Sequence, residues 1–195
     1  MVKLLTLVAF SLIFAISAHA FTEDKIPDGW TKLGNNPQGY KVTIDRESAY
    51  IGSQSVLIES IKNNINAKGS VSLTQTVDAA NYVGRRVSLS FYSKGASING
   101  ATGLVFQMYN SNSEIIDQVF KNFSNKEQID YWRKTSLAVD VLESTSFLLF
   151  GVYLTGQGKV WIDNISIEVV DTNTPLTDIN PKKIAKAEMK GEANE

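Results

Sequence analysis

The stretch that decides the fold is residues 86–94, with the sequence RVSLSFYSK. Its apolar side chains Val87, Leu89 and Phe91 occupy every second position, and serines and Tyr92 fill the positions between them. Successive side chains of a strand point to opposite faces of a sheet, so this alternation predicts a strand with one buried and one exposed face. Half-buried strands of this kind are typical of antiparallel sheets.

Short runs of the same kind follow one another along most of the chain, separated by clusters of Gly, Asn and Ser. The nine expected strands are Tyr40–Arg46, Ser55–Ser60, Ser70–Val77, Arg86–Lys94, Gly103–Asn110, Ile115–Lys121, Trp132–Val141, Ser146–Leu154 and Lys159–Val170. Short strands separated by turns predict an all-β fold, a two-sheet antiparallel sandwich. Within one of these runs, Gly151 predicts a bulge or a close approach of two backbones.

The segments outside the strands give the expected division of the chain. Residues 1–20 combine Lys3, a short apolar run and the ending SAHA, which is the pattern of a removable signal peptide. The apolar run is too short to span a bilayer. We expect an irregular lead-in at 21–39, the sandwich at 40–171 and a polar, disordered tail at 172–195. The signal peptide predicts a secreted or periplasmic protein with no membrane span after its removal.

The composition excludes several kinds of catalysis. After removal of residues 1–20 the chain holds no histidine and no cysteine, because its one histidine is His19. Ser-His-Asp and Cys-His catalytic sites are therefore excluded, as are zinc sites of the Cys/His type and thiol chemistry. The formal net charge is −1 and no basic patch occurs, so nucleic acid is not an expected partner. Calcium binding and glycoside hydrolysis by two carboxylates stay open.

Three stretches resemble the jelly-roll carbohydrate-binding modules found beside xylanases and cellulases. Residues 83–94, VGRRVSLSFYSK, resemble one strand of these modules, and residues 158–167, GKVWIDNISI, resemble their last strand. Residues 49–57, AYIGSQSVL, resemble one of their turns. The order and spacing of the three stretches also fit. The resemblance covers roughly residues 27–178, and it implies a jelly-roll sandwich of the galactose-binding-like type more specifically than it implies a sugar ligand.

The same resemblance implies a structural calcium ion at Asp163, between the last strand and an early turn. The other ligands would be Asp45, Glu47 and backbone carbonyls of residues 50–53, since calcium is held by oxygen atoms. The alternative is that Asp163 accepts hydrogen bonds from the N–H groups of a neighbouring turn.

The expected ligand-binding residues are aromatic and amide side chains of the strands and the turns beside them. Sugars place their C–H faces on aromatic rings, and their hydroxyl groups need polar partners. The candidates are Tyr92, Tyr109, Trp132 and Tyr153 for stacking, with Gln107, Gln118 or Asn110 as the polar partners. The alternative is that the aromatics are ordinary strand formers, with Trp132 in the core or at its rim.

Together these patterns predict a secreted, non-catalytic binding module for carbohydrate, with no cofactor other than the calcium ion. Two alternatives stay open. In the first, the domain binds a protein of the cell envelope or the extracellular space. In the second, it is a hydrolase that uses two carboxylates, although the spacing of the acidic residues singles out no pair. Those acids are Asp117, Asp130, Asp140, Glu143 and Glu168.

Overall fold

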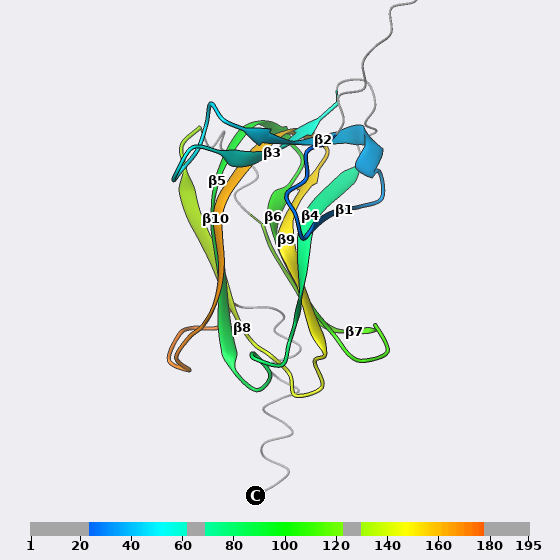
Figure 1. Ribbon diagram of the computed structural model, residues 1–195, viewed down its shortest axis with the longest axis vertical. Coiled ribbons are helices and arrows are strands. Elements are labelled where there is room, and N and C mark those ends of the chain that lie inside the picture. Colours follow the sequence, from blue (N-terminus) through cyan, green and yellow to red (C-terminus); the bar gives the residue numbers. More distant parts are fainter. Residues whose placement is uncertain (1–23, 62–68, 123–129, 178–195) are drawn as a thin grey trace, which may run out of the picture.

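The computed structural model describes residues 24–61, 69–122 and 130–177, which form two antiparallel sheets packed face to face (Figure 1). The strands are β1 (Trp30–Leu33), β2 (Tyr40–Asp45), β3 (Ser55–Ser60), β4 (Ser70–Asp78), β5 (Arg86–Asn99), β6 (Thr102–Tyr109), β7 (Ile115–Asn122), β8 (Arg133–Asp140), β9 (Phe147–Thr155) and β10 (Gln157–Val169). A 3-10 turn, η1 (Pro37–Gly39), precedes β2. The described ranges hold no helix long and apolar enough to cross a membrane.

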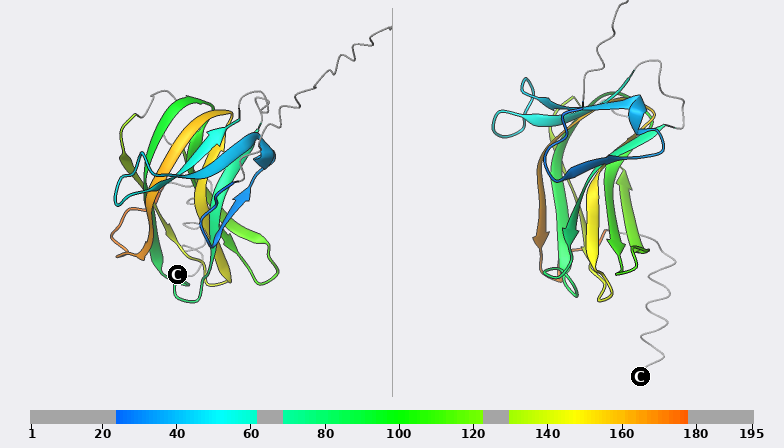
Figure 2. Two further views of the ribbon diagram at one scale, coloured as in Figure 1. Left: turned by 45° about the horizontal axis from the view of Figure 1, so that its top comes forward. Right: turned by 45° about the vertical axis from the view of Figure 1, so that its right-hand side comes forward.

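The chain crosses repeatedly between the two sheets. Sheet A has the strand order β1-β4-β9-β6-β7, and sheet B has the order β2-β3-β10-β5-β8. In Figure 1 strands β5, β8 and β10 of sheet B lie on the left and sheet A on the right, with β2 and β3 of sheet B across the top; Figure 2 gives two further views. The predicted all-β, antiparallel jelly-roll sandwich is therefore confirmed, with ten strands where nine were expected.

The additional strand is β1, which lies in the lead-in that was expected to be irregular. It pairs with β4, with Trp30 opposite Gln75, and the Trp30 ring meets the Phe150 ring edge to face at a centroid distance of 6.3 Å. The strand has only four residues and lies between Gly29 and Gly34, so too little alternation was present to predict it.

The ordered domain also extends past residue 171, where the tail was expected to begin. The Arg86 guanidinium forms an ion pair with Asp140 at 2.7 Å and donates to the carbonyl oxygen of Thr174 at 2.7 Å. The N–H of Thr177 donates to the carbonyl oxygen of Ala138 on the edge strand β8 at 2.8 Å. Residues 172–177 are thus attached to sheet B, whereas residues 178–195 and the expected signal peptide lie outside the described residues.

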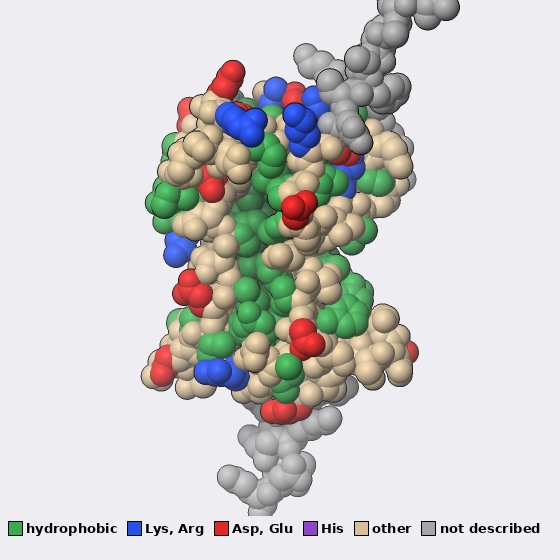
Figure 3. Space-filling view, viewed as in Figure 1, with side chains coloured by type: hydrophobic (Ala, Val, Ile, Leu, Met, Phe, Trp, Pro, Cys, Tyr) green, Lys and Arg blue, Asp and Glu red, His purple; other side chains and the backbone are tan. Residues whose placement is uncertain are grey.

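The core lies between the inner faces of the two sheets. Phe91 of β5 faces Phe106 of β6 and Phe150 of β9 within one apolar cluster, and each of these three side chains is at most 2 % exposed. Hydrophobic side chains form a band between the two sheets in the space-filling view (Figure 3). Because the chain has no cysteine, burial of apolar surface is the main source of stability for this sandwich.

Tyr40 is the one tyrosine among the largest fully buried side chains of the described residues. Its hydroxyl group lies 2.7 Å from the carbonyl oxygen of Gly69 and 2.8 Å from that of Gly156. The start of β2 is thereby joined to the residue before β4 and to the turn between β9 and β10. Burial raises the pKa of this hydroxyl above its ordinary value.

Replacement of Tyr40 by phenylalanine is expected to lower the free energy of unfolding by about 1–3 kcal/mol, because the one buried hydroxyl donor between the Gly69 and Gly156 carbonyl groups is lost. Urea denaturation at neutral pH measures this change, with Tyr131→Phe at an exposed position as the control. Since the folded-state pKa of Tyr40 is raised, its contribution is present below pH 10.0 and is lost as the pH rises further. An unchanged unfolding free energy in Tyr40→Phe would contradict this role.

Candidate functional site

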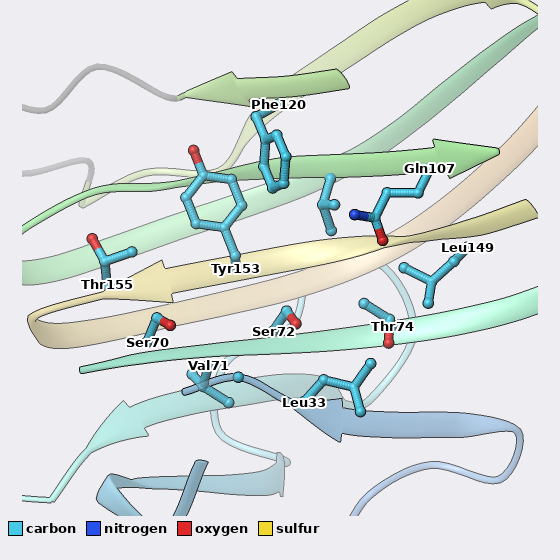
Figure 4. Close-up of a pocket in the computed structure, with 12 residues that line it drawn as sticks. Leu33, Ser70, Val71, Ser72, Thr74, Gln107, Phe120, Leu149, Tyr153 and Thr155 are labelled. Atoms are coloured by element: carbon cyan, nitrogen blue, oxygen red, sulfur yellow. The ribbon is translucent and has the colours of Figure 1, made fainter. Parts of the chain in front are cut away.

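The outer face of sheet A carries a hollow with a volume of about 390 Å³ (Figure 4). All five strands of the sheet contribute to it. The lining residues are Leu33, Gly34, Ser70, Val71, Ser72, Thr74, Val105, Gln107, Phe120, Leu149, Tyr153 and Thr155. None of these side chains carries a charge, so the hollow is an uncharged, largely apolar surface with a few amide and hydroxyl groups.

The floor of the hollow depends on Gly151, in the central strand β9. Its partners in the neighbouring strands, Thr74 and Val105, both line the hollow. A Cβ atom at position 151 would lie 2.0 Å from the carbonyl oxygen of Leu73, which is shorter than any tolerated contact. Gly151 therefore marks a close approach of two backbones, and it leaves the middle of the floor without a side chain.

Two aromatic rings stand over this floor. The rings of Phe120 and Tyr153 meet edge to face, with centroids 5.8 Å apart and an interplanar angle of 73°. The Phe120 side chain is 54 % exposed, and the Tyr153 hydroxyl donates to Asn122. Burial raises the pKa of that hydroxyl. Figure 4 shows both rings projecting from β7 and β9 toward the same space, where they offer an apolar wall to a ligand.

A chain of polar side chains lies beside the rings. The Tyr109 hydroxyl donates to Gln107 Oε1 at 3.0 Å, and Gln107 Nε2 donates to Gln118 Oε1 at 3.0 Å. The Tyr109 ring is stacked on the Phe147 ring at 4.7 Å, which fixes its position. Within the described ranges nothing accepts from Gln118 Nε2, so this group is a free donor for a ligand oxygen.

The structure divides the expected ligand-binding residues between two faces. Gln107, Tyr109 and Tyr153 lie together on the outer face of sheet A. Tyr92 and Trp132 belong to the outer side of sheet B, on the opposite side of the sandwich. The five residues therefore do not form one site, and only the first three belong to the hollow or its rim.

Two further residues differ from the sequence interpretation. Asn110 serves the β6–β7 turn, because its Oδ1 accepts the N–H groups of Asn112 and Glu114. Phe120 is a site residue that the sequence analysis missed. Its run begins with two adjacent isoleucines, at positions 115 and 116, and this obscures the alternation in which Val119 is buried and Phe120 is exposed.

The carboxylate of Asp163 binds the backbone of the β2–β3 loop. Its Oδ2 accepts the N–H groups of Tyr50 and Ile51 at 2.8 and 3.0 Å. This is the hydrogen-bonding alternative considered for Asp163. In the described ranges, no three Asp, Glu or His side chains lie close enough to hold a metal ion.

Asp45 is also engaged by the chain itself. Its Oδ2 accepts from the Trp161 indole N–H at 2.6 Å, and its Oδ1 accepts from the backbone N–H groups of Glu47 and Ser48 at 2.7 and 3.2 Å. The bond from Trp161 is the main reason that the pKa of Asp45 lies below its ordinary value. The backbone N–H of Glu47 donates to Asp45. Calcium binding by Asp163, Asp45 and Glu47 stays a prediction.

Comparison with the sequences of known proteins gives one curated relative. No protein-family model matches the chain. Over 159 residues it is 28 % identical to a Bacillus subtilis protein described as the uncharacterized HTH-type transcriptional regulator YbfP. That match covers 80 % of this chain and 52 % of the regulator, so the chain spans about half the length of this curated relative.

Solved structures show the fold more directly. The CBM22-1 xylan-binding domain of Paenibacillus barcinonensis Xyn10C superposes with a TM-score of 0.51 at 22 % identity, covering 77 % of this chain and 91 % of that domain. The enzymatically active domain of bacteriophage CBA120 tailspike protein 4 gives a TM-score of 0.59 at 16 % identity, covering 73 % of this chain but 20 % of that one. Other family 22 and family 16 carbohydrate-binding modules share the arrangement. The chain therefore has the jelly-roll fold of carbohydrate-binding modules.

Calcium is expected to raise the melting temperature of chelator-treated protein by about 2–4 °C for each kcal/mol of binding free energy. Differential scanning calorimetry with and without added calcium measures this shift, with magnesium as the control ion. The Asp163→Asn variant is expected to lose the shift. Equal melting temperatures of the wild type with and without calcium would contradict the prediction and leave Asp163 with its hydrogen-bonding role alone.

Proposed function

We propose that this chain is a non-catalytic binding module that takes an uncharged glycan into the hollow on the outer face of sheet A. The observation that carries the proposal is the exposed Phe120 ring set against Tyr153, above a floor that Gly151 keeps open. A sugar ring would lie with its C–H face on this aromatic wall. Its hydroxyl groups would meet the amides of Gln107 and Gln118 at the edge.

The uncharged lining defines the class of sugar. A carboxylate or sulfate group that entered the hollow would lose water without meeting an opposite charge, which is costly. Neutral hexoses or pentoses lose only hydroxyl hydration, which the amides and the Ser72 hydroxyl replace. Hydrolysis by two carboxylates has no counterpart here, because no Asp or Glu is among the lining residues.

The comparisons also support this proposal. The similar xylan-binding domain binds its sugar as a module of a larger protein. The match to the regulator covers about half of the regulator's length. It supports the view that the same kind of domain also occurs in proteins not described as hydrolases. The signal-peptide pattern of residues 1–20 supports action in the periplasm or outside the cell.

A glycan array tests the proposal with purified protein and two variants, Phe120→Ala and Tyr153→Ala. Wild-type protein is expected to bind neutral oligosaccharides, and each variant to bind them about tenfold more weakly or worse, which corresponds to about 1.4 kcal/mol or more. Ile115→Ala is the matched control, because Ile115 is an exposed apolar residue of the same strand outside the hollow. Melting temperatures of all variants verify that they are folded.

Two results would contradict the proposal. A blank array from folded wild-type protein would favour the alternative of an envelope or extracellular protein partner. Neutral-sugar binding that Phe120→Ala and Tyr153→Ala leave unchanged would remove the hollow as the site.

A further inference from the structure

A second aromatic cluster lies on the outer side of sheet B, away from the hollow. It consists of Tyr50, Tyr92, Lys94, Trp132 and Trp161, and we call it the sheet B platform. Its members come from the β2–β3 loop, from β5, from the residue preceding β8, and from β10. Figure 1 shows the β2–β3 loop at the upper left, near β5 and β10 and at the opposite end of β2 and β3 from η1.

Exposed ring surface is the first property of the platform. The Tyr50 ring is stacked on the Tyr92 ring at a centroid distance of 3.5 Å and an angle of 12°. The Trp132 ring lies 6.2 Å from Tyr50 at an angle of 57°. Tyr50 is 43 % exposed. Tyr92 and Trp132 are partly exposed, so three adjoining rings, rather than a single exposed aromatic, meet at this surface.

The second property is a cation between the two indoles. Lys94 Nζ lies 5.6 Å from the Trp132 ring centre and 4.7 Å from that of Trp161, within the range of cation–π attraction. The ammonium group also donates to the Ser48 hydroxyl. An ammonium carries three donors, so Lys94 keeps capacity for a further acceptor.

The platform is held in place by the chain's own carboxylates. Asp163 accepts the backbone N–H of Tyr50 and thereby holds the loop whose Tyr50 ring is stacked on Tyr92. The β5–β10 ladder changes register directly after Asp163, a local irregularity that redirects side chains. Asp45 accepts the side-chain indole N–H of Trp161 and so holds that ring directly. These hydrogen bonds hold the loop and the indole in place before any ligand arrives, which lowers the entropic cost of binding.

Two lysines bring positive charge to this surface. Asp45, whose pKa is lowered mainly by the Trp161 hydrogen bond and also by the charge of Lys94, is the acidic neighbour of the Lys94 ammonium group. Lys134 stands directly opposite Tyr92 in the β5–β8 ladder, so its exposed side chain shares the outer face with the platform. Lys94 and Lys134 together complement an anion, while the rings complement an apolar face. A sugar that bears a carboxylate offers both features in one residue.

We propose that the sheet B platform is a second binding site, specific for uronate residues of acidic glycans. The uronate C–H face lies on the rings of Trp132 and Tyr50, and its carboxylate pairs with Lys94. The site does not use the uncharged hollow, so it goes beyond the proposed function and does not depend on it. Because the two sites lie on opposite sheets, one molecule can hold a neutral and an acidic chain together.

The test uses an array of uronate-containing oligosaccharides, each paired with its methyl ester, which keeps the sugar's shape but removes its charge. Wild-type protein is expected to bind the acids, to bind them more weakly as the salt concentration rises, and to bind the esters about tenfold less or worse. Trp132→Ala and Lys94→Gln are expected to lose about tenfold or more of the binding to the acids. Phe120→Ala, in the hollow, is expected to retain it.

Three outcomes would overturn the second site. The first is an absence of uronate binding by folded wild-type protein. The second is equal binding of acids and methyl esters, a comparison that needs no variant and so does not depend on how the variants fold. The third is uronate binding that Phe120→Ala abolishes while Trp132→Ala and Lys94→Gln leave it intact, which would assign it to the hollow.

Discussion

The packing of the two inner sheet faces against each other is the constraint on which the rest of the structure depends. The chain has no cysteine, so this apolar burial holds the sandwich without disulfide bonds. Each strand gives every second side chain to the core, and the side chains between them must point outward. Burial of Phe106 therefore places Gln107 on the outer face, and burial of Val152 does the same for Tyr153. Both candidate sites lie on these outer faces.

Alternation within single strands carried most of the fold prediction and part of the site prediction. The predicted bounds of the nine strands lie close to the observed ones. The alternation also correctly assigned Tyr92, Tyr109 and Tyr153 to outer faces. It carries no information about which strands pair. Strands β5 and β6 are consecutive in sequence, yet they belong to different sheets, so Tyr92 and Tyr109 are on opposite sides of the molecule. Sheet membership depends on long-range pairing, which a local pattern does not encode.

Two residues that the sequence analysis missed lie where the alternating pattern gives no guidance. Phe120 lies in a strand whose alternation is interrupted by adjacent isoleucines, and Tyr50 lies in a loop, where no periodicity applies. Tyr50 reaches its place because Asp163, from a strand more than a hundred positions away in sequence, accepts its N–H. The resemblance to carbohydrate-binding modules drew attention to Asp163 as a metal ligand. In the structure the same carboxylate positions an aromatic ring, and the calcium prediction is separate from that role.

The central claim is that the hollow on sheet A is the site of neutral glycan binding. A titration of isotopically labelled protein with a neutral oligosaccharide, followed by NMR, tests it most directly. The account predicts shift changes in the backbone amides of β6, β7 and β9, and in the side-chain NH₂ groups of Gln107 and Gln118, with sheet B unaffected. Shift changes confined to sheet B or to the loops, under the same saturating sugar, would contradict it.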